Sequence, residues 1–246
     1  MEADIHWIDT AGSTNSLLAS QADTLPHGHV IAARRQTDGR GQRGNSWESE
    51  PDANLTFSLL LRPTAIMAAA QFELSMIVAL GVCDALENAS GKAFQVKWPN
   101  DIYYCDSKIC GILIENSLDG RRIGRSIAGI GINVNQRRFI SDAPNPVSLI
   151  NIIDRETPLR PLLEQVCNSI LGRLAAYELN PAPATLLAEY KSRLWRGRGF
   201  HQWHDALLDE DITAEIADVA PDGILTMRTT AGQTRRYAFK QISAIL

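Results

Sequence analysis

Apolar residues recur at intervals of three and four positions in the middle of the chain. Between residues 67 and 89 the side chains that keep this spacing are Ala68, Phe72, Met76, Ala79, Cys83 and Leu86. This period matches one face of an α-helix, so the pattern predicts a helix over 67–89. Similar patterns predict helices over 159–179 and 183–194, and the hydroxyls of Ser13-Thr14-Asn15-Ser16 suit an N-cap before a helix that contains Leu17.

Shorter apolar runs, bounded by glycine, proline or polar pairs, are typical of strands. They predict strands at 5–8, 29–37, 54–62, 94–97, 102–104, 109–114 and 121–134. Asp106-Ser107 separates the fifth and sixth runs and predicts a hairpin. Glycine alternates with isoleucine between Ile127 and Val134, which predicts that a ligand or a neighbouring segment approaches this backbone closely. The segments 38–46 and 140–158 are expected to be loops.

The pattern changes near residue 195. Arg196-Gly197-Arg198-Gly199 is typical of a linker. Beyond it, short strands are predicted at 212–219, 224–230 and 235–239, with turns at Pro221-Asp222-Gly223 and Ala231-Gly232. Short strands joined by tight turns predict a small β-barrel. We therefore expect two domains, 1–194 and 195–246.

Composition narrows the class of protein. The chain has 246 residues, 45% hydrophobic and 21% charged, so it can bury a full core, and neither disorder nor a coiled coil is expected. The net charge of −4 is unlike that of a dedicated nucleic-acid binder. The four cysteines form no C-x-x-C pair, the N-terminus does not resemble a signal peptide, and the apolar stretch 74–86 is too short to span a bilayer. We expect a soluble protein of a reducing cytoplasm that binds neither DNA nor a membrane.

A glycine-rich loop carries the first candidate chemistry. Gly39-Arg40-Gly41-Gln42-Arg43-Gly44 matches G-x-G-x-x-G, but a strand follows where a dinucleotide-binding fold opens a helix, and the kinase motifs H-R-D and D-F-G are absent. Glycine lets backbone amides approach an anion, Arg40 and Arg43 add guanidinium groups, and Trp47 offers a flat face to a base or ring. The competing interpretation is a solvated hairpin loop.

The second constellation is Lys97-Trp98-Pro99-Asn100-Asp101, followed by Lys108 and Gly111-Ile112-Leu113. A lysine, a tryptophan and an amide–carboxylate pair at the end of a strand suit a ligand site. The competing interpretation is a turn in which Asn100 and Asp101 cap the backbone and Lys108 extends along the surface.

Five blocks in this order resemble those of biotin protein ligases: Ser13-Thr14-Asn15, Gln36 to Gly41 with Trp47, Lys97 to Asp101, Lys108 with Gly111 to Leu113, and Gly129 to Asn133. The resemblance is strong over residues 5–135 and weak beyond them. It implies an α+β fold, in which a mixed β-sheet is flanked by helices and followed by a small C-terminal SH3-like barrel. Larger members carry an N-terminal winged helix-turn-helix. Because the catalytic block begins near residue 5, the chain resembles the monofunctional form without DNA binding.

The resemblance implies an ATP-dependent ligase. Biotin and MgATP would give biotinyl-5′-AMP and pyrophosphate, and a lysine of a biotin carboxyl carrier protein would then accept the biotin. The carboxylate of biotin is already ionised, so the first step needs two anions held together while charge spreads onto pyrophosphate, and no general base. The sequence leaves open the Mg²⁺ ligands, the acceptor and the oligomeric state, a homodimer included.

Roles follow from the resemblance for each block. The implied residues are, for catalysis, Lys108, Arg40 and Asp101; for biotin, Ser13, Thr14, Asn15, Gln36, Arg40, Gly41, Gln42, Lys108 and Gly111; and for the nucleotide, Arg40, Arg43, Trp47, Asn100, Asp101, Lys108 and Asn133. One departure concerns the loop, which in family members commonly has two further arginines where this chain has Gln42 and Asn45. Arg43 lies beside both and is the guanidinium that could substitute.

Two alternative functions are a lipoate or octanoate ligase or transferase of the same fold, and a non-catalytic biotin sensor. Gln36 and the Lys-Trp-Pro block favour biotin over lipoate, and the presence of Lys108 and Arg40 favours an enzyme over a sensor. Biotin-dependent exchange of pyrophosphate into ATP would discriminate between these functions.

Overall fold

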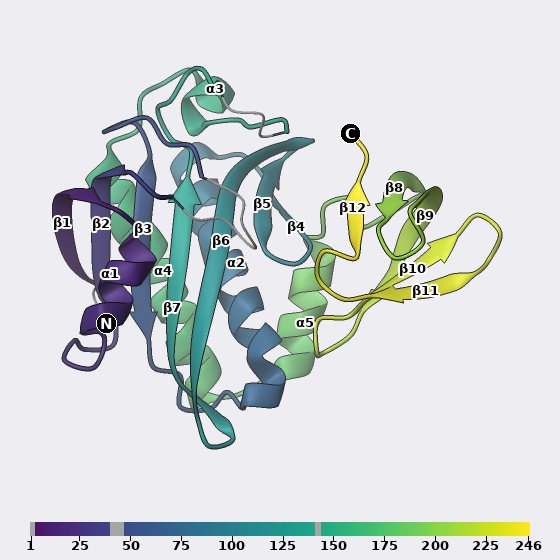
Figure 1. Ribbon diagram of the computed structural model, residues 1–246, viewed down its shortest axis with the longest axis horizontal. Coiled ribbons are helices and arrows are strands. Elements are labelled where there is room, and N and C mark those ends of the chain that lie inside the picture. The colour runs from purple at the N-terminus through teal and green to yellow at the C-terminus, as the bar shows by residue number, and fades with distance from the viewer. Residues whose placement is uncertain (1–2, 40–46, 141–143) are drawn as a thin grey trace.

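The computed structural model describes residues 3–39, 47–140 and 144–246. A seven-stranded sheet has the order β1-β2-β3-β7-β6-β5-β4, and β1 and β2 are parallel whereas every other neighbouring pair is antiparallel (Figure 1). Its strands are β1 (Asp4–Ala11), β2 (His29–Gln36), β3 (Leu55–Leu61), β4 (Gln95–Lys97), β5 (Asp101–Tyr104), β6 (Ser107–Asp119) and β7 (Arg122–Ile132). The expected mixed sheet and the hairpin at Asp106 are confirmed.

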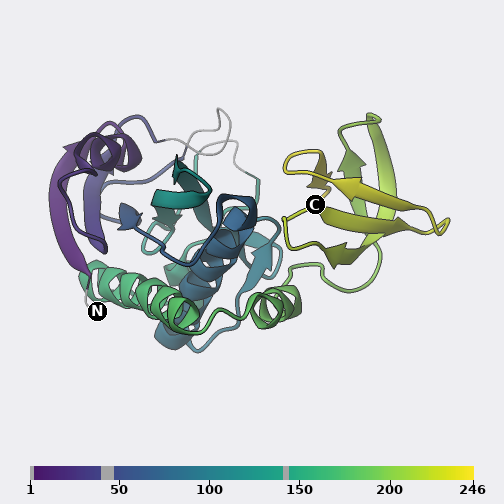
Figure 2. The ribbon, with the colours of Figure 1, turned by 90° about the horizontal axis from the view of Figure 1, so that it is seen from below.

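Helices cover both faces of this sheet. Two long helices, α2 (Gln71–Ser90) and α4 (Leu159–Leu179), lie on one face, and α1 (Thr14–Gln21) lies on the other (Figures 1 and 2). The main core fills the space between the sheet and α2 and α4, while a smaller cluster of Leu18, Ala22, Ile31, Leu60 and Ile127 lies beneath α1. Because both faces are covered, every residue of β3 is buried.

The helix predicted over 67–89 is present as α2, preceded by a single 3₁₀ turn, Ala68–Ala70. Residues 68–90 are long and apolar enough to cross a membrane, but 67% of the apolar window is buried inside the protein. Such burial is typical of the core helix of a globular protein. Ser13 caps α1, as the sequence predicts.

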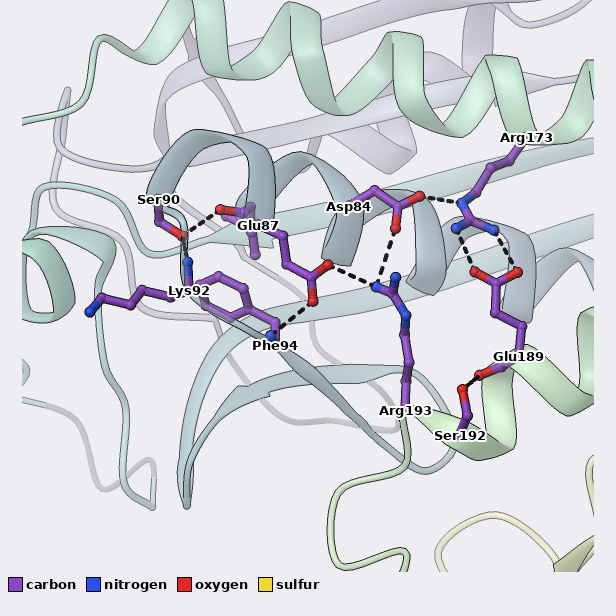
Figure 3. A network of polar contacts seen from close by, with 10 residues as sticks. Asp84, Glu87, Ser90, Lys92, Phe94, Arg173, Glu189, Ser192 and Arg193 are labelled. Atoms are coloured by element: carbon purple, nitrogen blue, oxygen red, sulfur yellow. Dashed lines mark hydrogen bonds and ion pairs between the residues drawn. The ribbon is translucent and has the colours of Figure 1, made fainter.

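An ion-pair network fastens the third helix of this layer, α5 (Pro183–Ser192), to α2 and α4 (Figure 3). Arg173 lies 2.5 Å from Asp84 and 2.7 Å from Glu189. Arg193, directly after α5, lies 3.2 Å from Asp84 and 3.3 Å from Glu87. Arg173 and Arg193 thus share the carboxylate of Asp84. These charge-assisted contacts fix residue 193 just before the chain crosses to the second sheet.

The C-terminal region forms a second, antiparallel sheet with the order β11-β10-β9-β8-β12. Its strands are β8 (His201–Asp205), β9 (Glu210–Val219), β10 (Leu225–Thr229), β11 (Thr234–Tyr237) and β12 (Ile242–Ala244). This agrees with the expected small β domain, but among the described residues β11 and β12, the two end strands of that order, do not pair, so the sheet is open and does not form the expected closed barrel. Strands β8 and β12 lie outside the runs that the sequence predicts.

Residues 193–195 connect the two sheets by pairing with β4. The amide of Val96 donates to the carbonyl of Arg193 at 2.8 Å, and the amide of Trp195 donates to the carbonyl of Val96 at 2.9 Å. The division into 1–194 and 195–246 stays a prediction. One loop prediction was wrong in part, because residues 149–153 within 140–158 form a short helix, α3 (Leu149–Ile153), whose first two residues are buried.

Candidate functional site

The predicted site residues that the structure describes meet at one end of the seven-stranded sheet. Strands β1, β2 and β7 end there and β3 and β6 begin there, because Ala11 pairs with Gln36, Leu55 with Ile132, and Ile132 with Cys110. Segments far apart in the sequence therefore lie together at this end, on the face that also carries α1 (Figure 1).

A buried cluster of hydroxyl and amide groups forms the first part of the site. The backbone amide of Thr14 and its hydroxyl donate to Gln36 Oε1 at 3.0 Å and 3.2 Å. The hydroxyl of Ser58 lies 2.8 Å from Thr14 Oγ1 and 2.5 Å from Asn15 Oδ1. Buried polar groups need partners, and these groups find them in one another, so the cluster holds donors and acceptors in fixed positions.

Ser58 belongs to this cluster, although the sequence did not identify it. It is completely buried on β3, between Phe57 and Leu59. The one available signal was a hydroxyl in the middle of an otherwise almost fully apolar strand. Ser13 was identified, and its hydroxyl accepts from the amide of Ser16 as the cap of α1.

Asn15 lies directly over β7 at Gly129. A Cβ atom at position 129 would stand 2.3 Å from Asn15 Oδ1, so only glycine leaves room for this amide. The Nδ2 group of Asn15 donates to Glu115 Oε2 at 2.7 Å, and Glu115 is a further partner that the sequence did not identify. The glycine pattern of β7 predicts that another segment approaches its backbone closely. At Gly129 that segment is α1.

Trp47 lies over the next glycine on the same face. A Cβ atom at position 131 would stand 2.4 Å from the indole ring, and one at Gly111 would stand 3.0 Å from it. Nζ of Lys108 lies 6.0 Å from the centre of the same ring. The ring thus covers the strand beside the charged part of the site.

Lys108 and Asp101 form that charged part. Lys108 Nζ donates to Asp101 Oδ2 at 2.7 Å, and the two side chains are 30% and 28% exposed. The backbone of Lys108 is held by residues 145–147, since its amide donates to the carbonyl of Asn145 and its carbonyl accepts from the amide of Val147, both at 2.9 Å. The ammonium group is therefore paired, accessible and anchored at its main chain.

Several polar atoms beside Lys108 have no hydrogen-bond partner among the described residues. They are Trp47 Nε1, Asn133 Oδ1 and both polar side-chain atoms of Asn145, all of them buried atoms. Asn133 uses its Nδ2 group to donate to the carbonyl of Val147 at 3.1 Å. An unpaired buried donor or acceptor is costly, so atoms of this kind gathered in one place suit a ligand that supplies the partners. Asn145 lies in the predicted loop and was not among the expected site residues.

The side chains of the block from Lys97 to Asp101 lie in two different places: some pack inside the protein or against the second sheet, and Asp101 reaches the site. Lys97 points to Tyr103, whose hydroxyl it contacts at 3.0 Å, and burial lowers the pKa of Lys97. Trp98 is buried against the second sheet, and its Nε1 group donates to the carbonyl of Gly223 at 2.9 Å. Asn100 is buried, and Asp101 contacts Lys108.

Part of the predicted site lies outside the described residues, namely Arg40, Gly41, Gln42 and Arg43. Within the described ranges, no group of three histidine, cysteine, aspartate or glutamate side chains could hold a metal ion. The structure therefore brings together Thr14, Asn15 and Gln36 on one side and Trp47, Asp101, Lys108, Gly111 and Asn133 on the other.

Sequence comparison relates this chain to protein ligases. A model of the biotin/lipoate A/B protein ligase family matches residues 7–133. The bifunctional ligase/repressor BirA of Bacillus subtilis is 38% identical over 130 residues, which cover 52% of this chain and 40% of that protein. The biotin–[acetyl-CoA-carboxylase] ligase of Mycobacterium tuberculosis is 30% identical over 189 residues, which cover 74% of this chain and 67% of that protein.

The same similarity extends to solved structures. A biotin protein ligase from Aquifex aeolicus, in complex with biotin and ATP, has a TM-score of 0.80 and 26% identity, and the match covers 98% of this chain and 97% of that one. By contrast, this chain spans only 40% to 51% of the length of five bacterial relatives.

Proposed function

Because the chain belongs to the biotin/lipoate A/B protein ligase family, we propose that it activates biotin with MgATP and transfers it to a lysine of a biotin carboxyl carrier protein. The observation that carries this proposal is the position of two groups on one face of the sheet. The buried hydroxyl and amide cluster lies at Gly129, Trp47 lies over Gly131, and Lys108 with its partner Asp101 lies beside Gly111, which pairs with Gly131.

The spacing of these two groups suits a molecule with a polar ring at one end and a carboxylate at the other. Positions 129 and 131 are two residues apart on one strand, so they point to the same side and lie about 7 Å apart. The ureido group of biotin, which has both donors and an acceptor, would face Thr14, Asn15 and Gln36. Its carboxylate would face Lys108. A ligand that lies on Gly131 must displace the ring of Trp47, which then covers the ligand.

In the first step, a carboxylate oxygen of biotin attacks the α-phosphorus of ATP, and the bond from that phosphorus to the β-phosphate oxygen breaks. Lys108 offsets the negative charge shared by carboxylate and α-phosphate. Asp101 holds the ammonium group of Lys108 in place. The unpaired atoms of Asn133 and Asn145 would contact the nucleotide, since both residues bond to the backbone at Lys108 and Ile109.

In the second step, the uncharged amine of the carrier lysine attacks the acyl carbon of biotinyl-5′-AMP. The carbon–oxygen bond to AMP breaks, and the nitrogen loses a proton as the amide forms. This step requires no cysteine, and three of the four cysteines of the chain are buried away from the surface.

Mg²⁺ enters with ATP as part of the substrate. Proteins usually hold Mg²⁺ through one or two carboxylates, with phosphates and waters as the other ligands, so a dedicated cluster is not needed. Asp101, with Asn100 beside it, provides oxygen atoms of the required kind next to Lys108. We propose a cytoplasmic site of action, where ATP and carrier proteins are available.

Exchange of radioactive pyrophosphate into ATP by the full chain tests the proposal. We expect exchange that depends on biotin, and transfer of biotin to a purified biotin carboxyl carrier domain. Lipoate and octanoate serve as comparison substrates. Exchange with either of them and not with biotin would show the alternative ligase, and biotin binding without any exchange would show a sensor.

A further inference from the structure

We propose that the C-terminal sheet positions the catalytic pair Lys108–Asp101 through Trp98, with Gly223 and Phe239 as positioning residues. The inference rests on the function proposed above, and it assigns a role in the reaction to a region that contains none of the five site blocks.

Trp98 contacts the C-terminal sheet and lies three residues before Asp101 in the sequence. Its Nε1 group donates to the carbonyl of Gly223 at 2.9 Å, across 125 residues of sequence. Its ring packs edge-on against Phe239, with the ring centres 5.2 Å apart. Both partners belong to connections of the C-terminal sheet, one between β9 and β10 and the other between β11 and β12. The C-terminal sheet thus holds this one ring from two loops.

The turn at Gly223 fits its place closely. Its φ angle of +88° is one that other residues rarely adopt, and a Cβ atom there would stand 2.9 Å from Phe72 and 3.2 Å from Phe239. Both distances are shorter than the separation at which carbon atoms attract each other, about 3.5–4.0 Å. Any side chain at position 223 must therefore push the turn away from the aromatic rings and its carbonyl away from Trp98.

The residues on either side of Trp98 are held as well. Val96 is bonded on both its amide and its carbonyl to residues 193–195. The carbonyl of Pro99 accepts from the hydroxyl of Tyr190 at 2.7 Å, and the ring of Tyr190 packs against Phe72. The backbone from 96 to 99 is therefore held in two ways. The β4–β5 pairing holds it within the hairpin, and residues outside the hairpin hold it through the contacts above.

A short connection links Trp98 to the catalytic pair Lys108–Asp101. Only residues 98–100 separate β4 from β5, and Asp101 begins β5. A displacement of Trp98 therefore moves Asp101 and, through the 2.7 Å contact, the ammonium group of Lys108. Misplacement of a reacting group by even about 1 Å can lower a rate about a hundredfold.

The test compares two glycines in the C-terminal sheet. Gly223→Ala forces the turn off Trp98, whereas Gly232→Ala places the same methyl group at a similar φ angle, +79°, with no atom within 4 Å. The substitutions share the backbone strain and differ in the contact with the aromatic rings. We expect Gly223→Ala to lower the maximal rate of biotin-dependent pyrophosphate exchange at least tenfold with biotin affinity within threefold of the original, and Gly232→Ala to change neither more than twofold.

A double substitution separates positioning from general damage. If Gly223 acts through Lys108, its effect must vanish when Lys108 is already gone, so Lys108→Ala and the double variant should exchange at the same residual rate. Trp98→Phe, which keeps a ring but removes the donor, should lower the rate in the same direction. Equal rates for Gly223→Ala and Gly232→Ala, or losses that multiply in the double variant, would overturn the inference.

A measurement without substrates keeps the inference separate from the proposed function. The carbon-13 NMR shift of the Asp101 carboxyl reports its contact with Lys108. Gly223→Ala should change that shift, and Gly232→Ala should leave it unchanged. If the original chain shows no biotin-dependent exchange, the proposed function fails, and the NMR comparison still decides whether the C-terminal turn controls the pair. An unchanged shift in Gly223→Ala would refute the control.

Discussion

Asp101 Oδ2 and Lys108 Nζ lie 2.7 Å apart at the beginnings of two successive strands, β5 and β6. The hairpin between them brings the last residue of one sequence block next to the first residue of the following block, seven positions later. Each partner is about 70% buried, so the pair is shielded but can still be reached by a ligand.

Lys108→Ala should slow adenylate formation by roughly 10²–10³, the scale on which one fixed electrostatic donor contributes to catalysis. The melting temperature should move little, because a partly exposed ion pair contributes about 1 kcal/mol or less. Pyrophosphate exchange and thermal unfolding measure the two effects. Lys92→Ala, at an exposed position after α2, is the matched control. Near-original exchange in Lys108→Ala would remove Lys108 from the mechanism.

Gly129→Ala should weaken biotin binding at least tenfold, since the new methyl group would meet Asn15 at 2.3 Å and push its amide out of the polar cluster. Gly172→Ala is the comparison, because nothing lies within 4 Å of that position in α4. It should leave binding unchanged and raise stability by up to about 1 kcal/mol. Titration calorimetry with biotin and thermal unfolding test both. Unchanged affinity in a folded Gly129→Ala protein would place biotin elsewhere.

Biotin should change the tryptophan fluorescence of the protein, because a ligand on Gly131 has to move the ring of Trp47. The change should fall by more than half in Trp47→Phe. Trp7→Phe should leave it intact, since Trp7 packs against the main core and not against the glycines of the site. A signal that survives in full without Trp47 would show that the ring stays where it is.

The C-terminal sheet should lose stability in acid through Asp205. Burial favours the neutral form of this carboxyl, but hydrogen bonds from Tyr237, the amides of Leu207 and Leu208, and Arg235 outweigh burial and lower its pKa below the usual 3.8. A carboxyl whose pKa is lower in the folded protein than in the unfolded chain contributes stability at pH values above its pKa in the unfolded chain. That contribution is lost as the pH falls through its pKa in the folded protein.

Asp205→Asn should therefore cost about 1–3 kcal/mol at pH 7, the range for disturbing buried hydrogen bonds. The difference from the original protein should shrink below about pH 4. Urea unfolding at several pH values measures it, and Asp222→Asn, in an exposed turn, provides the control. A difference that does not depend on pH would assign the effect to packing and not to charge.

Much of the fold could be predicted because local patterns determine it. The periodic apolar face of α2, the N-cap at Ser13 and the polar turn at Asp106 are signals contained in short segments. Strand β8 was not predictable in this way, because its sequence His201-Gln202-Trp203-His204-Asp205 has a single large apolar residue. Its place depends on pairing with β9 and β12.

The site could be predicted in its blocks but not in its contacts. The blocks carry Asp101 and Lys108, yet their pairing became visible only from the register of the hairpin. Ser58 was missed because a hydroxyl inside an apolar strand does not reveal which residues face it. The bond between Trp98 and Gly223 was beyond sequence reasoning, because no local pattern indicates which turn a distant indole will meet.

The pairing of residues 193–195 with β4 also determines where this protein can be divided. A chain cut after residue 194 would lose the amide of Trp195 that bonds to the carbonyl of Val96, and would leave an outer strand of the sheet open to self-association. The connecting segment belongs structurally to the first sheet as far as Gly197, whose amide donates to the carbonyl of Leu194 at 3.1 Å. For exchanging C-terminal regions between related proteins, the natural crossover point is therefore after this glycine, in the few residues that precede β8.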